Sequence, residues 1–367
     1  MNDETSLDAR LDQPSPVRAG ETLDVSAIAR YLRVQGIGAS DAVRVEQFPR
    51  GFSNLTYLIT AGDRSWILRR PPVGVGRRAG VAHDVVREAR LLESLGAAYP
   101  RVPRIVTICE DAAIIGAPFY LMERAVGIIL RDRLPPGLTL GAPAMRRVSE
   151  SVIDTLAEIH TIDFRAAGLG ELGHPDGYAQ RQVEGWTRRY QAARTGEQPA
   201  LESLADWLAT AVPSTGRTAL LHNDFKYDNI VLDPDDPARI VAVLDWEMAT
   251  IGDPLMDLGT ALAYWVEAGD PPALQSLGLG VTALPGNLSR EEVLARYAES
   301  TGHVVDAPVF YYAYGLFKVG VIAQQIYSRF VRGLTRDPRF AILDGAVTAL
   351  GEAGVRAIER GHIGSRA

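Results

Sequence analysis

The chain has 367 residues, 47% hydrophobic and 23% charged, a composition typical of a globular protein with room for two lobes or domains. Its formal net charge of −7 argues against a general nucleic-acid or membrane-surface binder, because such proteins normally carry a basic excess. No apolar stretch reaches the roughly 20 residues of a membrane-spanning helix. The single cysteine, Cys109, cannot form an internal disulfide and is expected to be a buried hydrophobe. Together these features predict a cytoplasmic protein.

The N-terminal part of the chain carries mostly strand patterns. Residues 1–20 are polar and are expected to form a flexible leader, followed by a helix over 23–36. Alternating apolar residues and intervening turn residues then predict five strands, at 43–48, 56–60, 65–70, 104–109 and 118–123, and one helix at 83–94. Residues 21–124 are therefore expected to form a small β-rich lobe.

After residue 124 the hydrophobic period becomes helical. Helices are expected at 145–160, 178–195, 201–210, 258–268, 290–300, 309–332 and 340–360, and short strands at 219–221, 230–232 and 240–244. Residues 125–367 are therefore expected to form a larger, mainly helical lobe. The predicted class is α+β, with two unequal lobes that meet near residues 124–127.

The most specific signal is the segment HNDFKYDN, which contains Asp224, Lys226 and Asn229 and is followed by Asp245 at the end of another apolar strand. Its pattern H-x-D-φ-K-x-x-N, with φ apolar, matches the catalytic loop of protein kinases. Asp224 is the candidate base that accepts the proton of a hydroxyl nucleophile, and Lys226 the candidate that neutralises a transferred phosphoryl group. Asn229 and Asp245 supply the oxygen ligands that Mg²⁺ prefers. The alternative is an acidic turn between two strands.

A turn of small residues lies between the first two strands of the N-terminal lobe. Its candidate contacts to nucleotide phosphates are Gly51, Phe52, Ser53 and Asn54. Small residues there would let backbone N–H groups approach phosphate oxygens, although an ordinary hairpin turn explains the same residues.

The third predicted strand offers two candidate contacts to ATP on one face, since alternate residues of a strand share a face. Ile67 could cover the adenine, and Arg69 could reach the phosphates and pair with Glu88 on the following helix. Arg70 takes this place if the strand register differs by one residue. The structural alternatives are an exposed arginine pair at a strand end and a solvated helical glutamate.

The segment that joins the lobes provides two further candidates. Glu123 and Ala125 would hold adenine through main-chain groups, unless this segment is only a buried strand. Farther along, Asp257 is expected at a helix start as an N-cap, with bracing of the catalytic loop as a second role. The aromatic helix near Tyr311, Tyr314 and Lys318 is expected to be core rather than an acceptor pocket.

Other familiar motifs do not fit. The glycine-rich segment at 74–80 has the wrong glycine spacing for a dinucleotide fingerprint, and no P-loop sequence occurs. The histidines lack the spacing of zinc ligands. No A-P-E segment or long activation loop follows Asp245, which disfavours a protein kinase.

These motifs together resemble the aminoglycoside/choline phosphotransferase family over about residues 40–335. The resemblance implies a protein-kinase-like bilobal fold and an enzyme that uses ATP and Mg²⁺ to phosphorylate a small molecule, with no nucleic-acid or membrane partner. It also implies specific roles: Asp224 as base, Asn229 and Asp245 as magnesium ligands, residues 51–54 as the phosphate turn, and Arg69 with Glu88 as the phosphate-positioning pair.

Several phrases, such as GFSNLTY and DWEMATIGDP, look closest to the branch associated with acyl-CoA dehydrogenases. That branch implies a hydroxyacyl-CoA or related hydroxy acid as the phosphate acceptor. Arg77 and Arg78 could contact the phosphates of a CoA moiety, although a solvated loop is the favoured interpretation of these two residues. This chain has Asn223 where that branch usually has glycine. The alternatives are an aminoglycoside or choline-like acceptor, and a catalytically silent protein that binds nucleotide or acyl-CoA.

Overall fold

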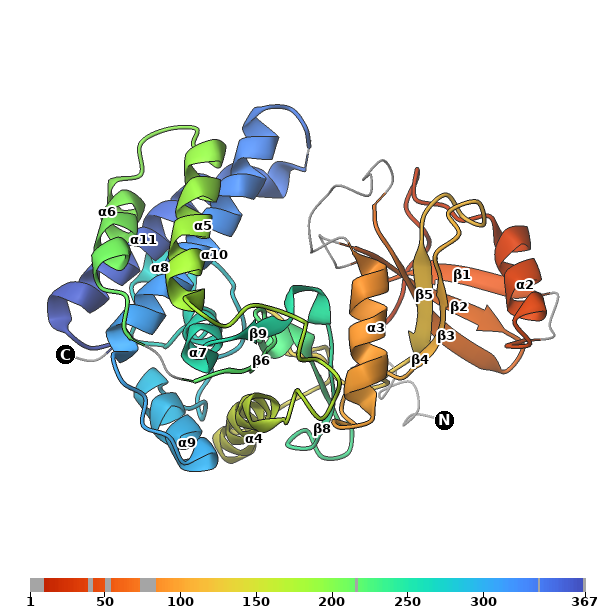
Figure 1. The fold of residues 1–367 in the computed structure, drawn as a ribbon, viewed down its shortest axis with the longest axis horizontal. Helices are drawn as coiled ribbons and strands as arrows, with labels where there is room; N and C mark the ends of the chain where they lie inside the picture. The colour runs from red at the N-terminus through yellow and green to blue at the C-terminus, as the bar shows by residue number, and fades with distance from the viewer. Residues whose placement is uncertain are drawn as a thin grey trace.

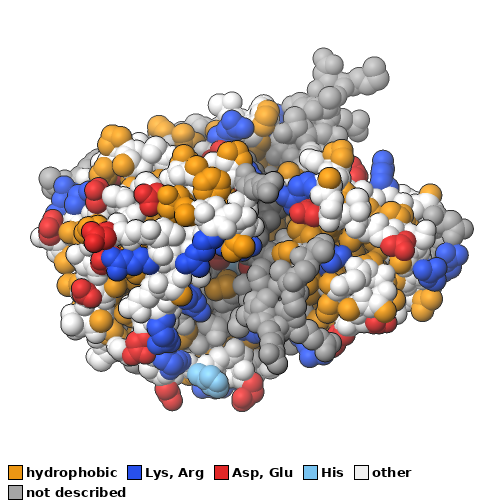
Figure 2. All heavy atoms as spheres, turned by 90° about the horizontal axis from the view of Figure 1, so that it is seen from above, with side chains coloured by type: hydrophobic (Ala, Val, Ile, Leu, Met, Phe, Trp, Pro, Cys, Tyr) orange, Lys and Arg blue, Asp and Glu red, His pale blue; other side chains and the backbone are white. Residues whose placement is uncertain are grey.

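The computed structural model describes residues 10–38, 42–49, 54–72, 84–214, 217–335 and 337–365. Within these ranges the chain forms a sheet-based N-terminal lobe and a mainly helical C-terminal lobe (Figure 1). The described side chains on the face in Figure 2 mix basic and acidic groups over both lobes. None of the helices in the described part of the chain combines the length and apolarity that a bilayer crossing needs.

A five-stranded antiparallel sheet forms the centre of the N-terminal lobe, in the order β1-β2-β3-β5-β4. The strands are β1 (Val43–Gln47), β2 (Leu55–Ala61), β3 (Arg64–Arg70), β4 (Ile105–Cys109) and β5 (Phe119–Glu123). All five predicted strands are therefore present with nearly the expected bounds. Strand β3 is central, and Arg69 lies on it opposite Thr56 and Tyr120.

Two helices cover opposite faces of this sheet. Leu68 packs in a cluster with residues of α2 (Val25–Val34), whereas its neighbour Ile67 packs in the cluster that contains α3 (Val85–Gly96). Alternate residues of a strand share a face, so Arg69 lies on the α3 side together with Ile67.

The C-terminal lobe contains eight α-helices in its described part: α4 (Ala142–Thr161), α5 (Tyr178–Ala193), α6 (Pro199–Thr210), α7 (Pro254–Ala263), α8 (Pro272–Gln275), α9 (Arg290–Thr301), α10 (Pro308–Val331) and α11 (Leu343–Arg360). Two short antiparallel ribbons accompany them. One pairs β6 (Ala219–Leu221) with β9 (Thr250–Gly252), and the other pairs β7 (Ile230–Leu232) with β8 (Ile240–Val243).

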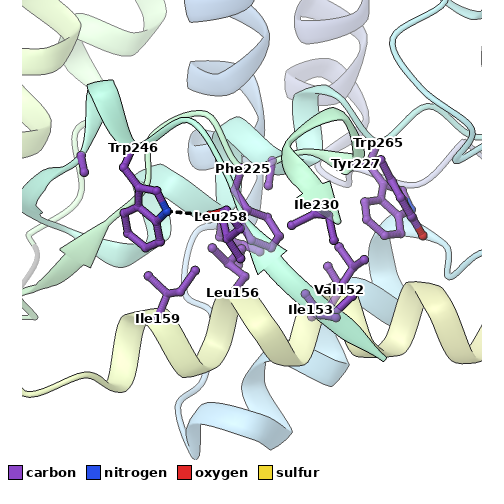
Figure 3. Close-up of a cluster of buried hydrophobic side chains, with 14 of the residues drawn as sticks. Val152, Ile153, Leu156, Ile159, Phe225, Tyr227, Ile230, Trp246, Leu258 and Trp265 are labelled. Atoms are coloured by element: carbon purple, nitrogen blue, oxygen red, sulfur yellow. Dashed lines mark hydrogen bonds between the residues drawn. The ribbon is translucent and has the colours of Figure 1, made fainter. Parts of the chain in front are cut away.

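Apolar side chains of helix α4 pack against the loops between these ribbons (Figure 3). Leu156 and Ile159 point from the helix toward Trp246, Phe225 and Leu258, and all five side chains are buried. The indole N–H of Trp246 donates to the carbonyl oxygen at position 243, 3.0 Å away. The loops therefore rest on a packed core, which limits their freedom to move.

Three predicted helices begin at least three residues from the expected start. The helix predicted from residue 145 begins at Ala142. The helix predicted at 258–268 spans Pro254–Ala263, because Asp253 caps it by accepting the N–H of Leu255 and proline is preset for the first helical turn. The helix predicted from residue 340 begins at Leu343, after a 3₁₀ turn over Pro338–Ile342. Strand β9 was not predicted.

Part of the segment predicted as a flexible leader is paired with the rest of the protein. Ser15 exchanges two backbone hydrogen bonds, both 2.8 Å, with Gln47 at the end of β1. Asp12 accepts a hydrogen bond from Arg131 in the C-terminal lobe and, through its carbonyl, from Arg124 between the lobes. Residues 10–18 therefore run along both lobes.

Candidate active site

The β7–β8 ribbon brings the two predicted metal ligands to one place. Ile230 pairs with Val243, and the N–H of Leu244 donates to the carbonyl of Asn229 at 2.8 Å, which extends the ladder by one step. Antiparallel pairing therefore sets Asn229 beside the residue that precedes Asp245. One hairpin spans the fifteen positions between Asn229 and Asp245 in the sequence.

Asp224 lies at the centre of a set of hydrogen-bond donors. The Lys226 ammonium is 3.0 Å from Oδ1 and 2.8 Å from Oδ2. The Asn229 amide nitrogen is 3.1 Å from Oδ2, and the Tyr264 hydroxyl is 3.2 Å from Oδ1. The side chain of Asp224 keeps 24% of its surface exposed, so a ligand can still reach this carboxylate.

Lys226 forms an ion pair with the candidate base in the structure. Burial by itself would lower the pKa of Lys226, but the Asp224 carboxylate raises it above its ordinary value. The ammonium also lies 4.8 Å from the centre of the Tyr264 ring. Lys226 therefore stays charged, and it would have to turn away from Asp224 to contact a phosphoryl group.

The donor set around Asn229 and Asp245 suits a magnesium ion. The Asn229 amide nitrogen is committed to Asp224, whose carbonyl oxygen is 2.8 Å away, so the amide oxygen is left for a ligand. Burial favours protonation of Asp245, yet Arg69 holds its pKa below the ordinary value, and its side chain is 31% exposed. Both oxygens are of the hard type that Mg²⁺ prefers. Among the described residues, no group of three or more His, Cys, Asp or Glu side chains could hold a metal.

The predicted ion pair between Arg69 and Glu88 is present, and it belongs to a larger cluster. One guanidinium nitrogen lies 2.9 Å from Glu88, and the other lies 2.9 Å from Asp245 and 3.2 Å from Glu247. The wide, planar fork of an arginine presents five N–H donors in fixed directions, so it can reach carboxylates that lie farther apart than those around the compact ammonium of a lysine. Arg70 lies on the other face, where it donates to the carbonyl of Ile115. The register question is thus decided in favour of Arg69.

The other nucleotide candidates of the N-terminal lobe have mixed outcomes. Gly51, Phe52 and Ser53, like Arg77 and Arg78, lie outside the described residues. Asn54 is described, and its amide nitrogen donates to Glu247 at 2.7 Å. Ile67 is buried in the core beside Tyr120 and Met122. The roles of these residues toward a nucleotide stay predictions.

The segment that joins the lobes follows β5 directly. Strand β5 ends at Glu123, whose amide donates to the carbonyl of Arg104 while its carboxylate pairs with the Arg104 side chain. Ala125 lies two residues beyond the strand and is half-buried. The adenine contacts expected from Glu123 and Ala125 also stay predictions.

Two residues of the site have left-handed backbone conformations. Asn223 has φ of 65° and Asp245 has φ of 66°, values that glycine, asparagine and aspartate tolerate best. This explains why asparagine can replace the glycine usual at position 223. Its side chain adds hydrogen bonds to the Tyr178 hydroxyl and the Met248 carbonyl.

Asp257 is not the helix N-cap that the sequence predicted. Because α7 begins at Pro254, Asp257 lies inside its first turn, fully buried, and accepts the N–H groups of His222 at 2.6 Å and Asn223 at 2.9 Å. Burial would raise its pKa, but the hydrogen bond from His160 helps to hold the pKa below the ordinary value. Asp257 thus holds the backbone just before the candidate base.

His222 itself orients the loop. Its Nε2 hydrogen-bonds to the carbonyl of Leu244 at 2.9 Å, and its Nδ1 accepts the N–H of Asp224 at 3.3 Å. Complete burial lowers the pKa of His222, so the ring is neutral near pH 7. The neutral ring therefore supports the loop through hydrogen bonds.

The aromatic helix is core, as expected. Tyr311, Tyr314 and Lys318 on α10 are all buried. The Lys318 ammonium donates to the carbonyl of Asn223 at 2.6 Å, underneath the loop that carries Asp224. Cys109 is buried too.

Sequence reasoning missed three residues at the site, Glu247, His160 and Tyr264, and it also missed the supporting contact of Lys318. Tyr264 is the one with a usable signal. It follows Asp257 by seven residues, so both lie on one face of a helix. That signal becomes readable only once α7 is known to begin at Pro254.

Comparison with known proteins decides the family. A model of the phosphotransferase enzyme family (APH) matches residues 44–291. The chain belongs to this phosphotransferase family. Acyl-CoA dehydrogenase family member 10 of Mus musculus is 37% identical over 322 residues, which cover 87% of the chain and 30% of the mouse protein. Acyl-CoA dehydrogenase family member 11 of Gallus gallus is 36% identical, over 87% of the chain and 41% of the chicken protein. The chain thus spans less than half the length of these relatives.

Solved structures share the kinase-like fold of this chain. A proposed aminoglycoside phosphotransferase from Ralstonia eutropha has a TM-score of 0.77 and 29% identity, over 92% of this chain and 99% of that one. Aminoglycoside phosphotransferase APH(4)-Ia, in a ternary complex with ADP and hygromycin B, has a TM-score of 0.57 and 19% identity, over 90% and 98%. An identity this low shows the fold alone. The predicted family and kinase-like fold are both confirmed.

Proposed function

We propose that this phosphotransferase moves the γ-phosphoryl group of ATP to a hydroxyl of a hydroxyacyl-CoA or related hydroxy acid, with Mg²⁺ as cofactor. One observation carries the proposal. Asp224, Asn229 and Asp245 lie together at the end of the β7–β8 ribbon, and Arg69 reaches Asp245 from the other lobe. A base, two oxygen ligands and a cation in one place are the parts that phosphoryl transfer requires.

Asp224 would act as the base. The acceptor oxygen forms a bond to the γ-phosphorus, the bond from that phosphorus to the β-phosphate oxygen breaks, and ADP leaves. The proton of the acceptor hydroxyl passes to the Asp224 carboxylate. Lys226 would turn from Asp224 to the transferred group, where its positive charge stabilises the negative oxygens.

Asn229 and Asp245 would hold Mg²⁺, which neutralises phosphate charge when bound. Arg69, kept in place by Glu88, would position the phosphates from the N-terminal lobe. Residues 51–54 would cover those phosphates, while Ile67 and the main chain of Glu123 and Ala125 would hold the adenine. ADP in the complex of the related fold supports ATP as the donor here.

The acceptor class rests on the names of the relatives. Two of them are acyl-CoA dehydrogenase family members, which supports an acyl-CoA or hydroxy acid with a free hydroxyl as the substrate. Hygromycin B in a more distant structure supports testing aminoglycosides as well.

The experiment is an acceptor screen with the purified chain, Mg²⁺ and either ATP or GTP. Hydroxyacyl-CoAs, choline-like alcohols and aminoglycosides are tested in parallel as acceptors, and ADP release is measured. Mass spectrometry then determines the mass of each product. We expect the wild-type protein to phosphorylate a hydroxyacyl-CoA or hydroxy acid. The Asp224→Asn variant should phosphorylate none of the acceptors. Nucleotide binding without transfer to any hydroxyl would contradict the proposal and favour a silent binding protein.

A further inference from the structure

Three residues on one face of α7 hold the loop that carries Asp224, either directly or through Lys318. Asp257, Thr260 and Tyr264 are spaced by three and four residues and therefore share that face. Asp257 accepts the N–H groups before Asp224. Thr260 lies 3.5 Å from the Lys318 ammonium, which itself holds the carbonyl of Asn223. Tyr264, the C-cap residue, reaches the carboxylate of Asp224 itself.

Tyr264 contacts the candidate base through its hydroxyl. Burial raises the pKa of Tyr264 above its ordinary value, so the phenol keeps its proton and donates to Oδ1 of Asp224. Oδ2 receives its own donor, the amide nitrogen of Asn229. Each carboxylate oxygen thus has one donor besides Lys226, and donors on both oxygens fix the plane of the group.

Helix α7 cannot shift to follow a moving carboxylate. Its Gly259 packs directly on the backbone of α10, where an added Cβ would collide with the carbonyl of Tyr311. Gly315 of α10 meets the carbonyl of Gly259 in the same way. This close backbone contact makes α7 a rigid support, and the short link from its last turn fixes the position of the Tyr264 ring.

We propose that Tyr264 is a positioning residue that keeps the Asp224 carboxylate aimed at the acceptor hydroxyl when Lys226 turns to the phosphoryl group. This inference rests on the proposed function. In the structure Lys226 bonds both carboxylate oxygens, so its departure would free the carboxylate to rotate. Tyr264 and Asn229 remain, one on each oxygen, and hold the group in its plane. Tyr264 acts through Asp224 and need not touch the acceptor.

The test compares Tyr264→Phe with Tyr264→Leu. The phenylalanine variant keeps the ring beside Lys226 and removes only the hydroxyl, whereas the leucine variant removes both. Tyr190→Phe is the matched control, because Tyr190 is also buried and donates to a carboxylate, Glu202 at 2.8 Å, on helices α5 and α6. Steady-state rates with MgATP and the best acceptor give kcat and KM, and thermal melting gives stability.

We expect Tyr264→Phe to lower kcat by about tenfold with both KM values within about twofold of wild type, because misplacing a reacting group slows chemistry more than binding. Its melting temperature should match that of Tyr190→Phe, which keeps wild-type kcat. Wild-type kcat in Tyr264→Phe would overturn the role, even if Tyr264→Leu were slow, since the ring alone would then matter. A wild-type protein that transfers phosphate to no acceptor would remove the proposed function and this role with it.

Discussion

Arg69 of β3 and Asp245 of the C-terminal lobe lie 2.9 Å apart, although 175 residues separate them in the sequence. The same guanidinium also forms ion pairs with Glu88 and Glu247, so one buried cation contacts three carboxylates. This cluster is one of the polar contacts that join the two lobes at the candidate site. It connects the position of α3 to that of the candidate metal ligand.

Replacing Arg69 should disturb both folding and nucleotide binding. Arg69→Ala leaves the carboxylates of Glu88, Asp245 and Glu247 without their common partner, which should cost about 3 kcal/mol in the free energy of unfolding. ATP affinity should fall about tenfold through the lost charged contact. Urea unfolding and titration calorimetry measure the two effects. Arg70→Ala, on the other face of β3, should lower stability and leave ATP affinity unchanged; equal affinity losses would rule out a phosphate role specific to Arg69.

Asp245→Ala should remove the magnesium dependence of nucleotide binding. Asp245 is the only carboxylate in the proposed ligand pair, so without it Mg²⁺ loses its charged protein ligand. Calorimetric titrations with ATP, with and without Mg²⁺, should then give nearly equal dissociation constants. Asp236 lies in the turn at the other end of the β7–β8 ribbon, so the Asp236→Ala variant should keep the wild-type magnesium dependence of ATP binding. An undiminished magnesium effect in Asp245→Ala would exclude the ligand role.

Asp257→Asn should weaken the support of the loop that carries Asp224. An amide offers one oxygen where the carboxylate now accepts the N–H groups of His222 and Asn223, and it turns a donor toward a donor. A loss of about 3 kcal/mol in unfolding free energy is expected, together with a lower kcat. Asp253→Asn keeps the oxygen that caps the helix, and its amide nitrogen can donate to the Tyr311 hydroxyl, which can accept as well as donate, so the change should cost less than about 1 kcal/mol. Similar losses in both variants would show that Asp257 is no more than a helix-start residue.

Position 223 should tolerate glycine better than alanine. Both substitutions remove the side-chain bonds to Tyr178 and Met248, but only alanine is strained at φ of 65°. Asn223→Ala should therefore be about 1 kcal/mol less stable than Asn223→Gly. Chemical denaturation of the two variants measures the difference. Equal stabilities would mean that the backbone relaxes out of the left-handed region.

Lys318 should make stability depend on alkaline pH. Burial lowers its pKa to about 8, although Asp257 and Asp224 oppose the shift. The unfolded chain, with an ordinary lysine pKa near 10.4, binds more protons between these values, so stability should rise with pH from about 8 to about 10. The rise is at most about 1.4 kcal/mol per pH unit for one group. Below pH 8 the protonated lysine carries the full cost of burial.

Denaturation at pH 7.5, 8.5 and 9.5 measures this slope. Lys318→Met should remove the contribution of Lys318, so the difference in unfolding free energy between wild type and variant should change with pH. A difference that stays constant over the range would show that the lysine pKa is not depressed in the folded protein.

Local patterns in the sequence predicted most of the secondary structure and the central chemistry. The alternation of β3 correctly placed Arg69 and Ile67 on one face, because the strand period leaves only two choices. The choice between Arg69 and Arg70 needed the packing of α3. The start of α7 was misplaced because apolar residues occur both before and after Pro254. Only the cap at Asp253 marks where the helix begins.

The sequence by itself determined which groups are the candidates for chemistry, because the spacing in HNDFKYDN and the strand before Asp245 are set by local backbone geometry. Only the tertiary structure decided which partners those groups have. Tyr264, Asp257 and Lys318 reach the loop around Asp224 through the packing of α7 against α10. Such contacts depend on how helices remote in sequence share a core, and short-range periodicity carries no information about that.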